Sequence, residues 1–120
     1  MEWTIAFHDA FESEFAGLPI EAQDELLAHA KVLALIGPTL GRPHVDTLAG
    51  SKHANMKKMR FEAADGVWRV AFAFDPTRAA VLLVAGDKSG VSQKRFYRSL
   101  IERADERFDR HLAALRTKEK

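Results

Sequence analysis

Four basic side chains in the second half of the chain are spaced so that they could bind one phosphate-bearing ligand. Lys58 and Arg60 are two residues apart in a segment that alternates polar and apolar residues, and Arg69 lies in the next such segment. Alternate side chains of a β-strand share a face, so Lys58 and Arg60 point the same way and Arg69 can join them from a neighbouring strand. A guanidinium stays charged and binds phosphate through two parallel hydrogen bonds. The pattern predicts an anion-binding surface, and Lys88, after a third such segment, could complete its rim.

Two further side chains could transfer protons at this surface or stack on a nucleobase. His53 precedes the strand that carries Lys58, and Tyr97 lies near the start of the last predicted helix. Imidazole and phenol groups perform both kinds of chemistry. Charged residues at the exposed positions of a half-buried sheet offer an ordinary explanation, but cations with few neighbouring acids repel one another unless an anion binds. The candidate site comprises Lys58, Arg60, Arg69, Lys88, Tyr97 and His53.

The spacing of apolar residues predicts the elements that position these side chains. Asp9 and Ser92 are expected to cap the first and last helices, and Gly37-Pro38 ends the second. The glycines and prolines of residues 37–54 predict a loop. Strands are predicted at residues 1–8, 56–61, 67–74 and 79–85, and helices at residues 9–17, 19–36 and 92–115.

Alternation along residues 67–74 separates the two faces of that strand. Trp68, Phe72 and Phe74 share one face, which we expect the helices to cover. The opposite face places Arg69 beside small alanines, which predicts a shallow, open surface where a phosphate backbone could lie. Residues 79–85 are apolar on both faces, which is typical of a central strand.

These elements predict an α+β fold in one domain spanning residues 1–120. The expected architecture is an antiparallel sheet, made of the N-terminal strand and a three-strand meander. Two N-terminal helices and one long C-terminal helix are expected to pack against it.

Composition excludes several classes of chemistry. The 120 residues contain no cysteine, which excludes disulfides and thiol nucleophiles and favours a reduced, cytoplasmic setting. The five histidines form no HxxxH pair, so no metal is expected, and the sequence lacks the common glycine-rich nucleotide-binding motifs, so no cofactor is expected either. The longest apolar run, residues 79–86, is far too short to span a bilayer.

Charge divides the chain unevenly. Residues 1–41 hold one base, Lys31, against seven acids, a net charge of −6. Residues 42–120 hold seventeen bases against ten acids, a net charge of +7. The basic part suits a polyanion, and the acidic helices suit either a docking partner or an ordinary solvated face.

Four segments resemble the RelE/ParE toxin superfamily, and within it the HigB-like, phage-derived branch. They are residues 55–62 (NMKKMRFE), 66–75 (GVWRVAFAFD), 79–90 (AAVLLVAGDKSG) and 95–109 (RFYRSLIERADERFD). The order of the predicted elements matches as well, and the resemblance is strongest over residues 55–110.

The resemblance implies a RelE-like fold and a type II toxin that acts as a ribosome-dependent mRNA endonuclease. In such a site the ribose 2′-OH attacks the adjacent phosphorus without a metal. Carried over by position, Lys58, Arg60 and Arg69 match the strand cations of the nuclease site, Lys88 the cation after the last strand, and Tyr97 a C-terminal aromatic residue. Lys58 could accept a proton if neighbouring charges favour its neutral form, and His53 or Tyr97 could donate one.

The implied partners are a cognate antitoxin with a helix-turn-helix domain like that of HigA, mRNA on the ribosome and, through the antitoxin, operator DNA. No membrane is implied.

The sequence departs from the family pattern in two ways. Asp87 directly precedes Lys88, where it could partly neutralise the site, and the last helix is long. Two alternatives stay open at this point. One is a ParE-like toxin that inhibits DNA gyrase by protein binding, and the other is a catalytically degenerate module that serves only as a regulatory partner of the antitoxin.

Overall fold

The computed structural model describes residues 2–118, and over these residues it confirms the α+β class. Met1 of the predicted first strand lies outside the described residues. The elements are β1 (Thr4–Phe7), α1 (Asp9–Ala16), α2 (Ile20–Ile36), the 3-10 helix η1 (Gly37–Thr39), β2 (Val45–Thr47), β3 (Met56–Ala63), β4 (Gly66–Phe74), β5 (Ala79–Asp87) and α3 (Gln93–Lys118).

The strands form one sheet in the order β1-β5-β4-β3-β2. Strands β3, β4 and β5 form the predicted antiparallel meander, and β5 has a neighbour on each side, as its two apolar faces indicate. The prediction of an antiparallel sheet was wrong for β1, which pairs in parallel with β5. Alternation reveals the faces of a strand but neither its partner nor its direction, so the sequence pattern did not contain this information.

Strand β2 lies inside the stretch predicted to be a loop. It pairs antiparallel with β3, placing Val45 opposite Met59, and Val45 is buried. A strand of three residues is too short to show a period of two, and the surrounding glycines and prolines hide it. β2 matters for the site because it pairs with only the first half of β3 and leaves the second half as an edge.

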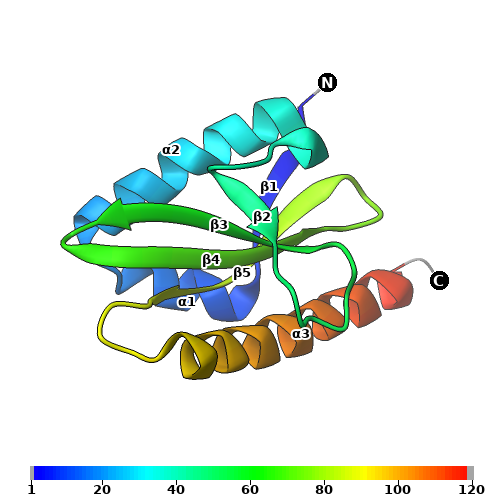
Figure 1. Ribbon diagram of the computed structural model, residues 1–120. Coiled ribbons are helices and arrows are strands. Elements are labelled where there is room, and N and C mark those ends of the chain that lie inside the picture. The colour runs from blue at the N-terminus through cyan, green and yellow to red at the C-terminus, as the bar shows by residue number, and fades with distance from the viewer. Residues whose placement is uncertain (1, 119–120) are drawn as a thin grey trace.

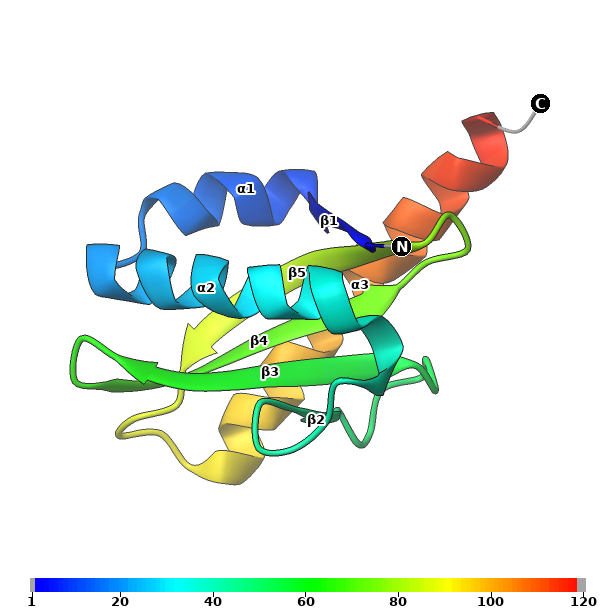
Figure 2. The ribbon, with the colours of Figure 1, turned by 90° about the horizontal axis from the view of Figure 1, so that it is seen from above.

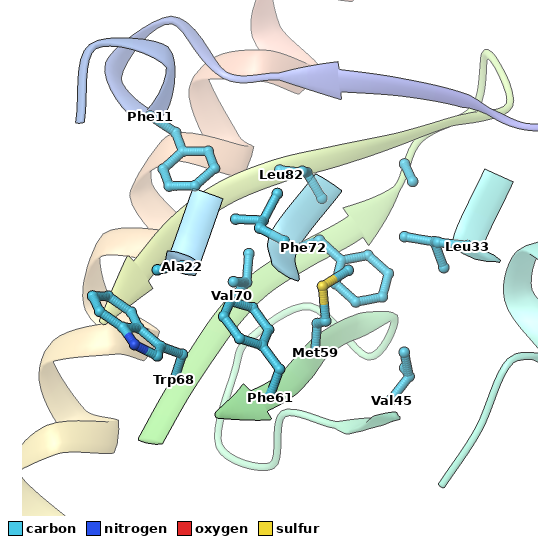
Figure 3. Close-up of a cluster of buried hydrophobic side chains, with 12 residues drawn as sticks. Phe11, Ala22, Leu33, Val45, Met59, Phe61, Trp68, Val70, Phe72 and Leu82 are labelled. Carbon is cyan, nitrogen blue, oxygen red and sulfur yellow. The ribbon is translucent and has the colours of Figure 1, made fainter. Parts of the chain in front are cut away.

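The face of the sheet that carries Trp68 and Phe72 is covered by α1 and α2, as predicted (Figures 1 and 2). Both side chains are buried, and Phe74 packs against the same core. Figure 3 shows this cluster, in which side chains from the helices meet those of the strands. Its labelled members are Phe11, Ala22, Leu33, Val45, Met59, Phe61, Trp68, Val70, Phe72 and Leu82.

The alanines of β4 predict an open surface on the opposite face, and this prediction is wrong. Helix α3 crosses it (Figure 2), and Ala71 and Ala73 are fully buried in a second core with Leu100 and Phe108 of α3. The physical reason is that small side chains on a sheet allow a helix to approach as readily as a ligand. What stays uncovered is the end of the sheet near the β3–β4 hairpin, beside the start of α3 (Figure 1).

Candidate functional site

The pairing of β3 with β4 and the first turn of α3 bring four of the predicted site residues together, namely Lys58, Arg60, Arg69 and Tyr97. Arg60 lies directly opposite Arg69 across the two strands. A Cβ atom on Gly86 of β5 would lie 2.9 Å from the ring of Phe96, so the glycine allows α3 to begin close to the sheet. Tyr97 follows Phe96 and thereby reaches the cations of β3 and β4.

The Tyr97 hydroxyl is the meeting point of two cations. The Nε–H group of Arg69 donates to Tyr97 Oη at 3.1 Å, and Lys58 Nζ donates to the same oxygen at 3.5 Å. Lys58 Nζ also lies 4.5 Å from the centre of the Tyr97 ring, a cation–π contact. Arg69 is only 9% exposed, and its Nη1 donates to the backbone oxygen of Trp68 at 2.8 Å. The arrangement fixes the Arg69 guanidinium on both sides.

This environment changes the acidity of the phenol. Burial by itself would raise the pKa of Tyr97, but the hydrogen bond from Arg69 and the positive charge of Lys58 outweigh it, and the pKa is lowered from its usual value. Since the oxygen accepts from both cations, its own proton can be directed to a ligand. The phenol is therefore a better proton donor than an isolated tyrosine.

Arg60 completes the cation cluster, which we define as Lys58, Arg60 and Arg69. Its guanidinium lies 3.6 Å from the carboxylate of Asp46 on β2, which Arg42 also binds at 2.8 Å. The Arg60 Nε atom is buried and has no hydrogen-bond partner among residues 2–118. A buried donor without a partner is costly, and an anion at the cluster would satisfy it.

A cavity of about 480 Å³ opens beside the cluster. Its walls come from the second half of β3, the start of β4, helix α2 and the residues just before β2. The lining residues are Glu25, His29, Pro43, His44, Arg60, Phe61, Glu62, Val67 and Arg69. A cavity that is polar and carries two arginines suits a charged ligand better than an apolar one.

Sequence reasoning missed the two histidines of this cavity. The rings of His29 and His44 lie 5.4 Å apart, and His29 lies 5.5 Å from the ring of Phe61. The backbone oxygen of His44 accepts a hydrogen bond from the Arg60 N–H at 3.0 Å, which holds His44 at the edge of β3. No sequence signal could have found the pair, because the two residues belong to different elements that meet only in the folded chain.

Lys88 lies in the loop after β5, and its backbone N–H donates to the oxygen of Val67 at the cavity wall. The neighbouring Asp87, expected to neutralise the site, accepts from the N–H groups of Val67 and Ser89 at 3.0 and 2.9 Å. The carboxylate therefore holds the loop together. Lys88 stays a candidate at the rim.

His53 is not brought to the cluster. Its Nε2 lies 2.8 Å from Asp109 of α3, and its ring packs edge-on against Phe108. Asp109 is twelve residues beyond Tyr97, which is about 18 Å along a helix. Figure 1 shows the loop between β2 and β3 reaching down toward the middle of α3, where Ser51 donates to Asp105. His53 thus anchors that loop to α3, away from the cation cluster.

Over residues 2–118, no three histidine or acidic side chains are grouped so that they could hold a metal ion. In the same part of the chain, no helix combines the length and the apolar character needed to cross a bilayer.

Residues 13–109 match the model of a protein family described as "Phage derived protein Gp49-like (DUF891)". The chain belongs to the Gp49-like family. This agrees with the phage-derived, HigB-like branch that the sequence resembles.

Two relatives from Mycobacterium tuberculosis support this membership. One, named as a candidate toxin HigB3, is 42% identical over 103 residues, covering 86% of this chain and 88% of the relative. The other, named as a candidate toxin HigB2, is 44% identical over 98 residues, covering 81% of this chain. The aligned part is 48% of HigB2, so this chain spans about half the length of that relative.

Among solved structures, the chain is similar to the E. coli toxin RelE in the free state, in a double arginine-to-alanine mutant. The TM-score is 0.60 at 12% sequence identity, covering 84% of this chain and 95% of RelE. At that identity the similarity shows the fold, and the fold of this Gp49-like protein is RelE-like.

Proposed function

We propose that this protein is the toxin of a type II toxin–antitoxin system and that it cleaves mRNA on the ribosome. Membership of the Gp49-like family and similarity to proteins named as toxins support the first part. The observation that carries the second is the convergence of Lys58 and Arg69 on the hydroxyl of Tyr97, beside a polar cavity. Such a site needs no cofactor to cleave RNA.

In the proposed reaction the ribose 2′-oxygen attacks the adjacent phosphorus, and the bond from phosphorus to the 5′-oxygen breaks. The products are a 2′,3′-cyclic phosphate and a free 5′-hydroxyl. Arg60 and Arg69 bind the non-bridging oxygens, where negative charge increases in the transition state. Tyr97 donates its proton to the leaving 5′-oxygen, and Lys58 stabilises the phenolate that remains. Lys88 at the rim binds the neighbouring phosphate.

The proton of the 2′-OH group needs an acceptor. Lys58 and His44 are the two candidates, since Lys58 belongs to the cluster and His44 lines the cavity beside Arg60. An imidazole is an effective base near neutral pH. We assign this role to His44, because Lys58 is already engaged with Tyr97 as a cation.

We also propose the partners of this toxin. A cognate antitoxin with a helix-turn-helix domain neutralises it, and the complex binds operator DNA through that domain. mRNA on the ribosome is the substrate.

The test is expression without antitoxin, followed by primer extension on translated transcripts. The wild type should arrest growth and leave breaks inside coding regions. Arg69→Ala should abolish both effects, because losing one preorganised donor costs on the order of a hundredfold or more in rate. Arg78→Ala is the control and should stay toxic, since Arg78 lies in the distant β4–β5 turn against Trp3.

Two other outcomes would favour the alternative functions. Growth arrest with intact mRNA and induction of the DNA-damage response would instead support gyrase inhibition. Absence of arrest would support a degenerate regulatory module.

A further inference from the structure

Helix α2 presents apolar side chains to solvent at its C-terminal half. Leu35 is 67% exposed, Ile36 48% and Val32 40%. Single exposed apolar residues are common on proteins, but contiguous groups mark interaction sites. These three lie within five residues of one helix, and Val32 also lines a groove. The group therefore needs a partner to explain it.

The groove, called here the α2 groove, runs between α2 and the β2 side of the sheet. Ala28 and Val32 form one wall, and Leu40, Val45 and Met59 form the rest of its apolar lining. Its volume is about 190 Å³, enough for a few side chains but not for a folded domain. It therefore fits a short segment that inserts apolar side chains while the exposed residues of α2 cover its flank.

Charge indicates the character of that segment. Glu25 is the acidic residue of the groove lining, and Glu21 and Asp24 precede it on α2. The last turn of α2 carries no basic residue, so the negative end of the helix dipole beside Ile36 is not compensated by a side chain there. Residues 1–41 as a whole have a net charge of −6. A second copy of this chain would bring the same acidic helix to this surface, whereas a basic segment is attracted to it.

The α2 groove adjoins the site cavity, since Glu25, His29 and His44 line both. Arg60 lines the site cavity, so a segment that extended from the groove into this cavity would lie beside Arg60. It would therefore obstruct the approach of RNA to the cation cluster.

We propose that the α2 groove binds an amphipathic helix of the cognate antitoxin, with apolar residues at helical spacing and lysine or arginine on the flanks. This inference rests on the proposed toxin–antitoxin function, but not on the chemistry of the nuclease. Apolar anchors in a groove supply the affinity, and the flanking charges supply the orientation.

The test is capture of this chain by its tagged cognate antitoxin, encoded by the neighbouring gene, with affinity measured by calorimetry. Leu35→Glu and Val32→Glu should each weaken binding by about tenfold or more. Glu25→Lys should weaken it as well, and added salt should weaken wild-type binding. Val91→Glu is the matched control: Val91 is 44% exposed but lies in the loop before α3, so this variant should bind as the wild type does.

Circular dichroism should show that each variant is folded, which the exposure of these positions favours. Capture of Leu35→Glu and Val32→Glu at wild-type affinity would overturn the proposal. Failure of the wild type to bind the antitoxin would overturn it together with the proposed toxin–antitoxin function. Arg69→Ala distinguishes antitoxin binding from the nuclease chemistry, because this variant should lose mRNA cleavage and keep wild-type antitoxin binding.

Discussion

The hydroxyl of Tyr97 gives the sharpest test of the proposed site, because Tyr97→Phe removes one oxygen and little else. The ring keeps its edge-on contact with Phe96 at 5.2 Å and its place under Lys58. What is lost is the acceptor at 3.1 Å from Arg69 Nε and the proton available to the substrate. The substitution therefore separates the chemistry of the phenol from its packing.

The stability cost follows from the burial of Arg69. A buried donor left without its acceptor costs about 1–3 kcal/mol. Arg69 keeps the bond from its Nη1 to the Trp68 oxygen, and Tyr97 is half-buried, so water can reach part of the gap. We therefore expect about 1 kcal/mol, the lower end of that range, measured by urea unfolding.

The expected effect on cleavage is much larger. A proton donor in the transition state contributes about 10²- to 10⁴-fold in rate. Tyr97→Phe should therefore cleave mRNA in a translating extract at least about a hundredfold more slowly, while most molecules stay folded. Ser99→Ala on the same helix is the control and should change neither quantity. Cleavage at the wild-type rate by folded Tyr97→Phe would refute the role assigned to the phenol.

Three other predictions concern separate parts of the molecule. His44→Gln should lower the cleavage rate by about a hundredfold, whereas cleavage at the wild-type rate would remove His44 from the mechanism. Burial, and then the positive charge of Arg107, lower the pKa of His8, whose Nδ1 accepts from the Ala10 N–H at the start of α1. Stability should therefore fall as the pH drops below about 6.5, as thermal unfolding would show, and His8→Asn should reduce this dependence because it caps without titrating. Phe108→Ala should cost about 3–5 kcal/mol in denaturant unfolding by opening a cavity under α3, and a cost below 1 kcal/mol would contradict the packing of the second core.

The sequence by itself determined most of the elements and the faces of the central strands. Alternation is a local property of a strand, so it placed Trp68 and Phe72 under the helices and Arg69 on the opposite face. The same locality applies to Lys58 and Arg60, which lie two residues apart on β3 and therefore share a face. Residue type and position near the start of the last helix made Tyr97 a candidate, and the family resemblance agreed, but its contact with Lys58 and Arg69 could not be predicted from a local pattern.

Tertiary structure decided everything that depends on contacts between distant elements. It paired β1 in parallel with β5, laid α3 over Ala71 and Ala73, and moved His53 to the far part of α3. It also brought His29 and His44 together at the edge of β3, through the unpredicted strand β2. The physical reason is that side-chain period fixes which way a residue points, whereas its neighbours depend on which elements pack together, and that choice is made by the whole core at once.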